Sequence, residues 1–211
     1  MSEDTQIVSN EVKKTDLKSF FLNNKKSLIT SIIIILLALF AYFFYIDYKK
    51  DQKVKISDQY NLAIINYDRD KPNSSVLEMK NIIKAKDPTY STLALYFLLD
   101  NNLLDNKDEI NEYFDILIND VKLEKETKNL IIFKKGLYNS ESANEEELLS
   151  IFNPLINREN LWQSHTLYII AEYFFSKNEM KKSKEFFEKI LELKKPNQNI
   201  RLEAQKRLQR D

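Results

Sequence analysis

The sequence predicts an all-α protein in which an N-terminal transmembrane helix is followed by an α-solenoid of about nine helices. Three observations lead to this fold class. Residues 27–46 form an unbroken run of twenty uncharged residues. Beyond that run, apolar residues recur at spacings of three and four, as they do along one face of a helix. The 211 residues include only one glycine and four prolines, too few for the frequent turns of an all-β sandwich or barrel.

The first element is the apolar run, which at 1.5 Å per residue makes a helix about 30 Å long, the thickness of a bilayer's hydrocarbon core. It divides the chain into a polar tail (1–26), a transmembrane helix (27–46) and a helical domain (47–211). The run is too long, and its end too bulky, for a cleaved signal peptide, so we expect an uncleaved signal anchor. The residues expected at the membrane interfaces are Lys25, Lys26, Tyr42, Tyr45, Tyr48, Lys49 and Lys50.

The orientation of this helix follows from what lies on either side of it. Five lysines precede it and four follow within two turns, so the positive-inside rule is nearly balanced. A long C-terminal domain is translocated largely regardless of its charge. We therefore expect a cytoplasmic N-terminus and a domain outside the membrane.

The domain that follows contains nine apolar stripes, separated by residues that typically begin or end helices. Asp87 precedes a proline and is expected to cap a helix N-terminus. Asn106 and Asn144 each precede a glutamate by three residues, the spacing of a capping box. These signals predict helices of about 10–20 residues joined by short turns, the pattern of an α-solenoid.

The clearest repeat unit runs over residues 161–196 and resembles the tetratricopeptide pattern of two antiparallel helices. It departs from that pattern at Leu167, where an aromatic residue is usual, and at Ile190, where a small one is usual. The middle of the chain matches the pattern poorly, so the predicted solenoid is degenerate. The residues expected to pack the two helices together are Leu167, Ile170, Ala171, Phe174, Ser183, Phe187 and Ile190.

The composition excludes many kinds of catalytic site. One glycine cannot build a phosphate-binding loop or a dinucleotide fingerprint, which need several. The absence of cysteine excludes disulfides, thiolate zinc sites and cysteine nucleophiles, and a single histidine, His165, cannot form a multi-histidine metal site. The net charge is zero, and that of residues 47–211 is −1, so nothing indicates a nucleic-acid partner. We expect no enzymatic activity, no cofactor, no metal and no small-molecule substrate.

The order of the parts, together with two short segments, resembles a known family. The segments are residues 56–60 (ISDQY), which open the first helix of the domain, and residues 88–94 (PTYSTLA), with a tyrosine followed by small residues and Leu-Ala. They are similar to the ancillary Sec translocon subunit family of single-span proteins of the bacterial inner membrane with a periplasmic tetratricopeptide-like domain. The resemblance implies association with the protein-export channel and periplasmic chaperones, and it implies no catalytic residue.

The function expected from these features is that of a membrane-anchored adaptor for protein–protein interactions near the export channel. The alternative is an envelope assembly factor, such as a scaffold for respiratory-complex or cytochrome maturation. Trp162 and Tyr173 are the candidate partner contacts, because tryptophan and tyrosine tolerate half-buried positions well. The expected partners are therefore the lipid bilayer and other proteins.

Overall fold

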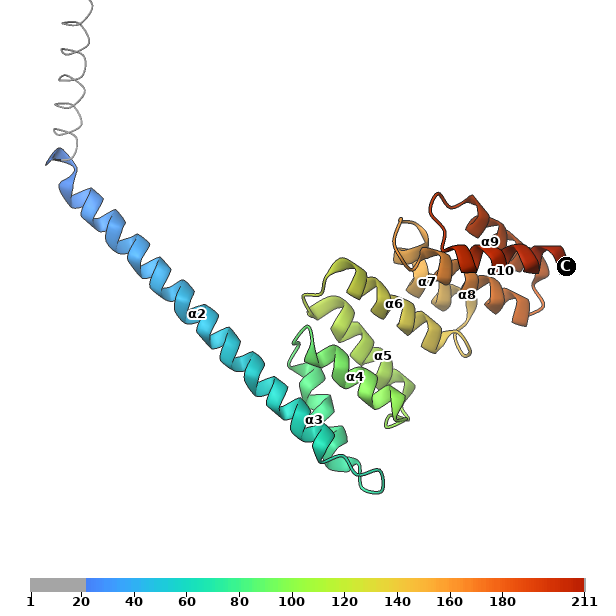
Figure 1. Cartoon of the computed structure of the whole chain (residues 1–211), viewed down its shortest axis with the longest axis horizontal. Helices are drawn as coiled ribbons and strands as arrows, with labels where there is room; N and C mark the ends of the chain where they lie inside the picture. The colour runs from blue at the N-terminus through green and yellow to red at the C-terminus, as the bar shows by residue number, and fades with distance from the viewer. Residues whose placement is uncertain (1–21, 211) are drawn as a thin grey trace, which may run out of the picture. The chain divides into compact units, whose positions relative to one another are not determined.

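The computed structural model describes residues 22–210, and this part of the chain is helical, without β-strands. The predicted polar tail, residues 1–26, lies almost wholly outside the described residues. The all-α class is confirmed, with a single long N-terminal helix followed by eight shorter ones within the described range (Figure 1). The elements are α2 (Lys25–Ile65), α3 (Asn73–Lys84), α4 (Tyr90–Asp100), α5 (Lys107–Asp115), the π-helical η1 (Ile116–Asp120), α6 (Lys125–Asn139), α7 (Glu145–Ile156), α8 (Gln163–Ser176), α9 (Met180–Glu192) and α10 (Gln198–Arg210).

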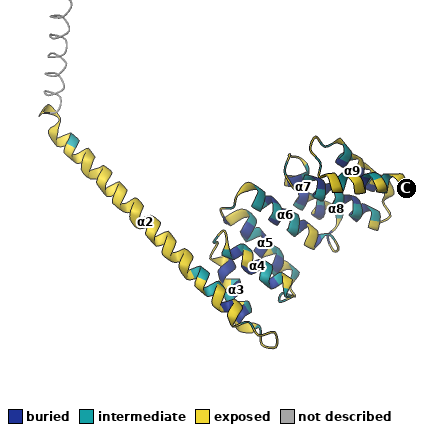
Figure 2. Ribbon diagram, viewed as in Figure 1, coloured by how far each residue is buried: buried dark blue, intermediate teal, exposed yellow. Residues whose placement is uncertain are grey.

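Helix α2 is long and apolar enough to cross a membrane. None of its most apolar stretch is buried, as the continuous exposed colouring in Figure 2 shows. A core helix of a soluble protein would instead bury such residues, because large apolar patches are rarely left in water. The exposed isoleucines, leucines and phenylalanines therefore indicate a membrane segment.

The chain divides into two compact units, and the division falls between Lys55 and Ile56, inside α2. The predicted boundary at residues 46–47 thus coincides with no helix end. Residues 47–55 contain neither glycine nor proline and include four lysines, which are good helix formers, so the helix continues through them. The last turns of α2, from Ile56 onward, supply the first apolar stripe of the second unit.

Three side chains expected to cap helices do so. The Asp87 carboxylate accepts hydrogen bonds from the backbone amides of Thr89 and Tyr90, at 2.9 and 2.8 Å. The Asn106 side chain accepts from the amides two and three residues further on, and that of Asn144 accepts from the amide three residues further on. Each bond satisfies a donor that has no partner within its own helix, which fixes where α4, α5 and α7 begin.

In the second unit, helices that follow one another in sequence pack together, most extensively in the pairs α3–α4, α6–α7, α8–α9 and α9–α10. Helices α4, α6, α8 and α10 begin 35, 38 and 35 residues apart. Several hydrogen bonds and ion pairs join positions separated by 33 to 37 residues. Each of them connects one helix pair to the next, and their sequence spacing is close to that between the helix starts. These links are Ser57 with Tyr90, Lys86 with Asp120, Glu126 with Leu161, Glu145 with Lys182, Glu159 with Lys195, Ser164 with Asn197 and Glu172 with Arg207.

A buried pair of residues sixteen positions apart recurs in four successive stretches of the second unit. The first member is small in three of the four pairs, which lets two helices approach closely, and the second is large and fills the space between them. The first members lie 35, 38 and 35 residues apart, the same spacing as the helix starts. The pairs are Ala63 and Met79, Leu98 and Phe114, Gly136 and Phe152, and Ala171 and Phe187.

The residues expected to pack α8 against α9 all lie in the core, each at most 3% exposed. They are Leu167, Ile170, Ala171, Phe174, Ser183, Phe187 and Ile190. Leu167, Ala171, Phe187 and Ile190 form one cluster with Ala204 of α10, which thus covers the end of the last helix pair.

Candidate functional site

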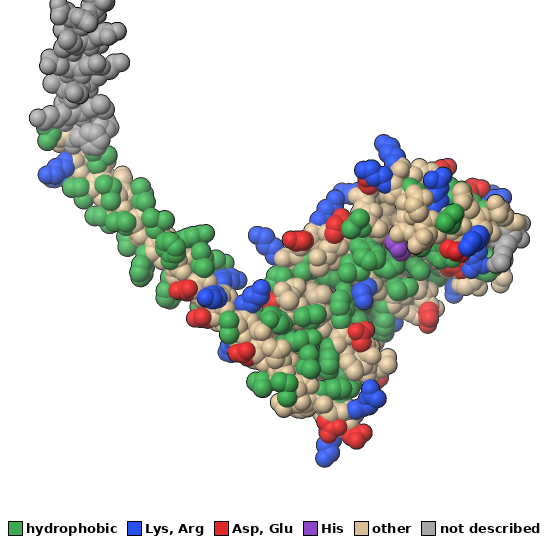
Figure 3. Space-filling model, viewed as in Figure 1, with side chains coloured by type: hydrophobic (Ala, Val, Ile, Leu, Met, Phe, Trp, Pro, Cys, Tyr) green, Lys and Arg blue, Asp and Glu red, His purple; other side chains and the backbone are tan. Residues whose placement is uncertain are grey.

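The residues predicted to lie at the membrane interfaces are all exposed side chains of α2. They stand before and at the end of its apolar stretch, and in Figure 3 the side chains between them are almost all hydrophobic. The Lys49 ammonium lies 5.8 Å from the centre of the Tyr45 ring, so lysine and tyrosine share the second edge. The full set is Lys25, Lys26, Tyr42, Tyr45, Tyr48, Lys49 and Lys50.

Tyr173, predicted to contact partners, is instead a core residue. Its side chain is 8% exposed, and its hydroxyl donates a hydrogen bond to the Ala143 carbonyl at 3.2 Å. Burial raises the pKa of the Tyr173 hydroxyl. The prediction fails because the turn between α6 and α7 brings a carbonyl to the phenol, so its polar end needs neither water nor a partner.

Trp162, the other predicted contact, is half-buried immediately before α8. Its ring stacks on Phe133 with the ring centres 5.2 Å apart, and it lies 5.6 Å from the His165 ring. No hydrogen-bond partner lies near the buried Nδ1 of His165 within the described residues, and the ring packs between aromatic neighbours. Partner contact through the exposed part of Trp162 stays a prediction.

Among residues 22–210 no cluster of histidine, aspartate and glutamate is suited to hold a metal ion.

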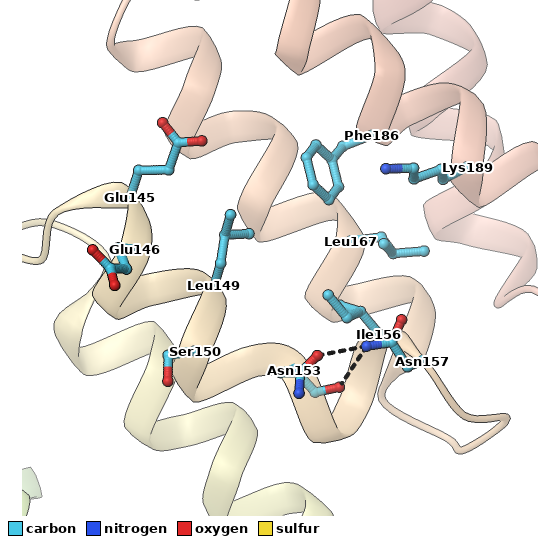
Figure 4. A pocket seen from close by; sticks show the side chains of 10 residues that line it. All are labelled: Glu145, Glu146, Leu149, Ser150, Asn153, Ile156, Asn157, Leu167, Phe186 and Lys189. Carbon is cyan, nitrogen blue, oxygen red and sulfur yellow. Dashed lines mark hydrogen bonds between the residues drawn. The ribbon is translucent and has the colours of Figure 1, made fainter.

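A groove of about 730 Å³ lies between α7, α8 and α9 of the second unit (Figure 4). Its floor is apolar and comes from all three helices: Leu149 and Ile156 of α7, Leu167 of α8 and Phe186 of α9. Helix α7 contributes because it carries two apolar faces. Leu148, Phe152 and Leu155 point into the core, whereas Leu149 and Ile156 face the groove.

The α7 side of the groove is edged by polar side chains at spacings of four, three and four, which places them in one row along the helix. The row consists of Glu146, Ser150, Asn153 and Asn157. The Asn157 amide donates to the Asn153 side-chain oxygen at 2.5 Å. The Asn153 amide nitrogen and the Ser150 hydroxyl form no hydrogen bond within the described part of the chain, so both are available to a bound molecule.

The end of the groove at the start of α7 carries excess negative charge. The Lys182 ammonium is shared between the carboxylates of Glu145, at 2.6 Å, and Glu179, at 2.8 Å. Glu146 has no ion pair among residues 22–210. On the opposite wall, Lys189 is neutralised by Glu185 at 2.7 Å. Three carboxylates and one ammonium therefore gather at this end, which favours a cation.

The groove was not predicted from the sequence, although one signal pointed to it. Leu167 stands where the tetratricopeptide pattern usually has an aromatic residue, and its side chain lies in the wall of the groove. A leucine occupies less volume than an aromatic side chain, so space remains between α7 and α9. The sequence shows the substitution, but the space depends on how far apart the two helices lie.

The chain matches no known family model, and no curated protein or solved structure matches it significantly. The similarity to the ancillary Sec translocon subunits therefore remains an expectation from short sequence segments. What the protein binds has to be argued from the groove and from α2.

Proposed function

We propose that this protein is a membrane-anchored helical-repeat adaptor that binds other proteins outside the cytoplasmic membrane. The observation that carries the proposal is the open groove between α7, α8 and α9, on a helical unit attached to a helix able to cross a membrane. An apolar floor with a polar edge is the usual composition of a site that binds a segment of another protein.

The architecture we propose for the second unit is a tetratricopeptide-like α-solenoid. The recurring spacing of 35 to 38 residues, the buried pairs sixteen residues apart and the links between successive helix pairs support it. Solenoids present extended surfaces because each repeat contacts only its neighbours, and such surfaces commonly bind proteins. In this arrangement α10 caps the last repeat.

The cellular setting we propose is the bacterial inner membrane, with a single span, a cytoplasmic N-terminus and a periplasmic domain. The order of tail, span and domain supports this orientation, because a long C-terminal domain is translocated largely regardless of charge. The resemblance to the ancillary Sec translocon subunits favours partners at the export channel and among periplasmic chaperones. In that setting the adaptor holds chaperones or emerging chains close to the channel.

The proposed topology predicts at which positions of the chain a fused reporter enzyme is active. A reporter that is active only outside the cytoplasm should be active when fused after Asp211 and inactive when fused after Lys26, because the span separates the two positions. Enzyme activity in intact cells, normalised to the amount of fusion protein, measures this. Activity at Lys26 and none at Asp211 would invert the orientation and remove the proposed function.

A further inference from the structure

We infer that the groove between α7, α8 and α9 binds an extended segment of about five residues from a partner protein, with apolar side chains and a lysine or arginine at one end. This inference rests on the proposed function and names the chemistry of the partner.

The length of the groove favours an extended segment. Its polar edge runs from Glu146 to Asn157, eleven residues of helix, or about 16 Å at 1.5 Å per residue. An extended chain of about five residues covers that distance at about 3.3 Å per residue. A helix spanning the same distance of about 16 Å would need about eleven residues, fewer than the roughly 12–15 at which isolated helices become stable in water, so the bound form in this inference is extended.

The floor and the edge match the two kinds of group that an extended segment presents. Alternate side chains point the same way along such a segment, and they can rest on Leu149, Ile156 and Phe186. Its backbone exposes N–H and C=O groups, which the Ser150 hydroxyl and the Asn153 amide can bind because neither is fully used by other groups of residues 22–210. Main-chain hydrogen bonds then hold the segment, while the apolar contacts select its side chains.

The acidic end of the groove determines the charge of the segment. Glu145 and Glu179 compete for the ammonium of Lys182, and Glu146 has no ion pair within the described range 22–210, so a lysine or arginine placed there gains a partner. Elsewhere positive and negative side chains are interspersed on the face shown in Figure 3. With one dominant charge contact and a nearly neutral unit, binding should depend only weakly on salt.

Synthetic peptides test the inference on the full-length protein in lipid nanodiscs. The probe is a fluorescein-labelled six-residue peptide with leucines at alternating positions and a terminal lysine. Matched peptides carry glutamate in place of the lysine, or serines in place of the leucines. Fluorescence anisotropy should give the tightest binding for the leucine–lysine peptide, with affinity at least tenfold lower for each matched peptide.

Two variants and one matched control assign the binding to the groove. Glu146→Lys should weaken binding of the leucine–lysine peptide at least tenfold and strengthen binding of the glutamate peptide. Leu149→Trp should weaken both at least tenfold, because Leu149 is a partly exposed residue of the groove floor and the indole fills the groove. The control, Glu147→Lys, removes a carboxylate from the same helical turn but outside the groove, and should change affinity less than twofold.

The inference is overturned if Glu146→Lys leaves the preference for the basic peptide unchanged, or if wild type binds none of the peptides. Tighter binding of a cross-linked helical peptide than of the extended one would also overturn it. Glu146 is exposed, so Glu146→Lys keeps the test valid even where Leu149→Trp lowers the melting temperature. The proposed adaptor function is tested by different experiments, the reporter fusions and cross-linking in cells, so its failure can be distinguished from the failure of this inference.

Discussion

Replacing Phe152 with alanine should lower the free energy of unfolding by about 3–5 kcal/mol. The Phe152 ring is fully buried, lies against Gly136 of α6 and is 6.3 Å from the Phe133 ring, centre to centre. Its removal loses the transfer free energy of the ring and leaves a cavity between α6 and α7. For a unit of this size the melting temperature should fall by roughly 6–20 °C, measured by far-ultraviolet circular dichroism of the full-length protein in detergent.

The control for this substitution is Leu161→Ala, because the Leu161 side chain is 71% exposed. Its effect should stay within about 0.5 kcal/mol, as for most surface substitutions. A Phe152→Ala protein that melts like the control would show that α6 and α7 are not packed through this ring.

Gly136→Ala should destabilise the protein in the presence of Phe152 and stabilise it in its absence. An added Cβ at Gly136 falls well inside the contact distance of the Phe152 ring, so helix or ring must move, at about 1–3 kcal/mol. That cost exceeds the gain of up to about 1 kcal/mol from replacing glycine with alanine in a helix. In a Phe152→Ala background the three nearest contacts of the added Cβ are gone, and we expect the gain to exceed the remaining cost.

The measurement is a double-mutant cycle of unfolding free energies for Gly136→Ala, Phe152→Ala and the combination. A change of sign for Gly136→Ala between the two backgrounds is expected, which corresponds to strong coupling between adjacent residues. Equal destabilisation in both backgrounds would show that the glycine is required for a reason other than the close approach of α6 to α7.

The parts of the fold that could be predicted from the sequence depend on neighbours along the chain. The membrane-spanning segment is recognised from one continuous run of apolar residues. The caps at Asp87, Asn106 and Asn144 each involve backbone amides at most three positions away. The recurring buried pairs in the middle of the chain are not evident from the sequence, because their two members stand sixteen residues apart. Their first member changes from alanine to leucine to glycine, and the spacing stretches from 35 to 38 residues around Gly136.

Less of the candidate site could be predicted from the sequence, because its geometry also depends on residues that are far apart in the chain. Tyr173 was assigned to the surface because nothing local shows that the Ala143 carbonyl, thirty residues earlier, accepts its hydrogen bond. The groove depends on the distance between α7 and α9, which share no continuous sequence pattern. Only the unusual Leu167 and the second apolar face of α7 mark it in the sequence.

Site-specific photo-cross-linking in living cells tests the adaptor function most directly. A photoreactive residue is placed at Ser150, in the groove, and in a separate protein at Lys184, an exposed position of α9 outside it. We expect a discrete cross-linked partner from position 150 that is absent from position 184 and is lost with Leu149→Trp. An export-channel component or an exported chain would support the export role, and a maturation complex would support the envelope-assembly alternative. No discrete partner from position 150, or the same products from both positions, would contradict the account.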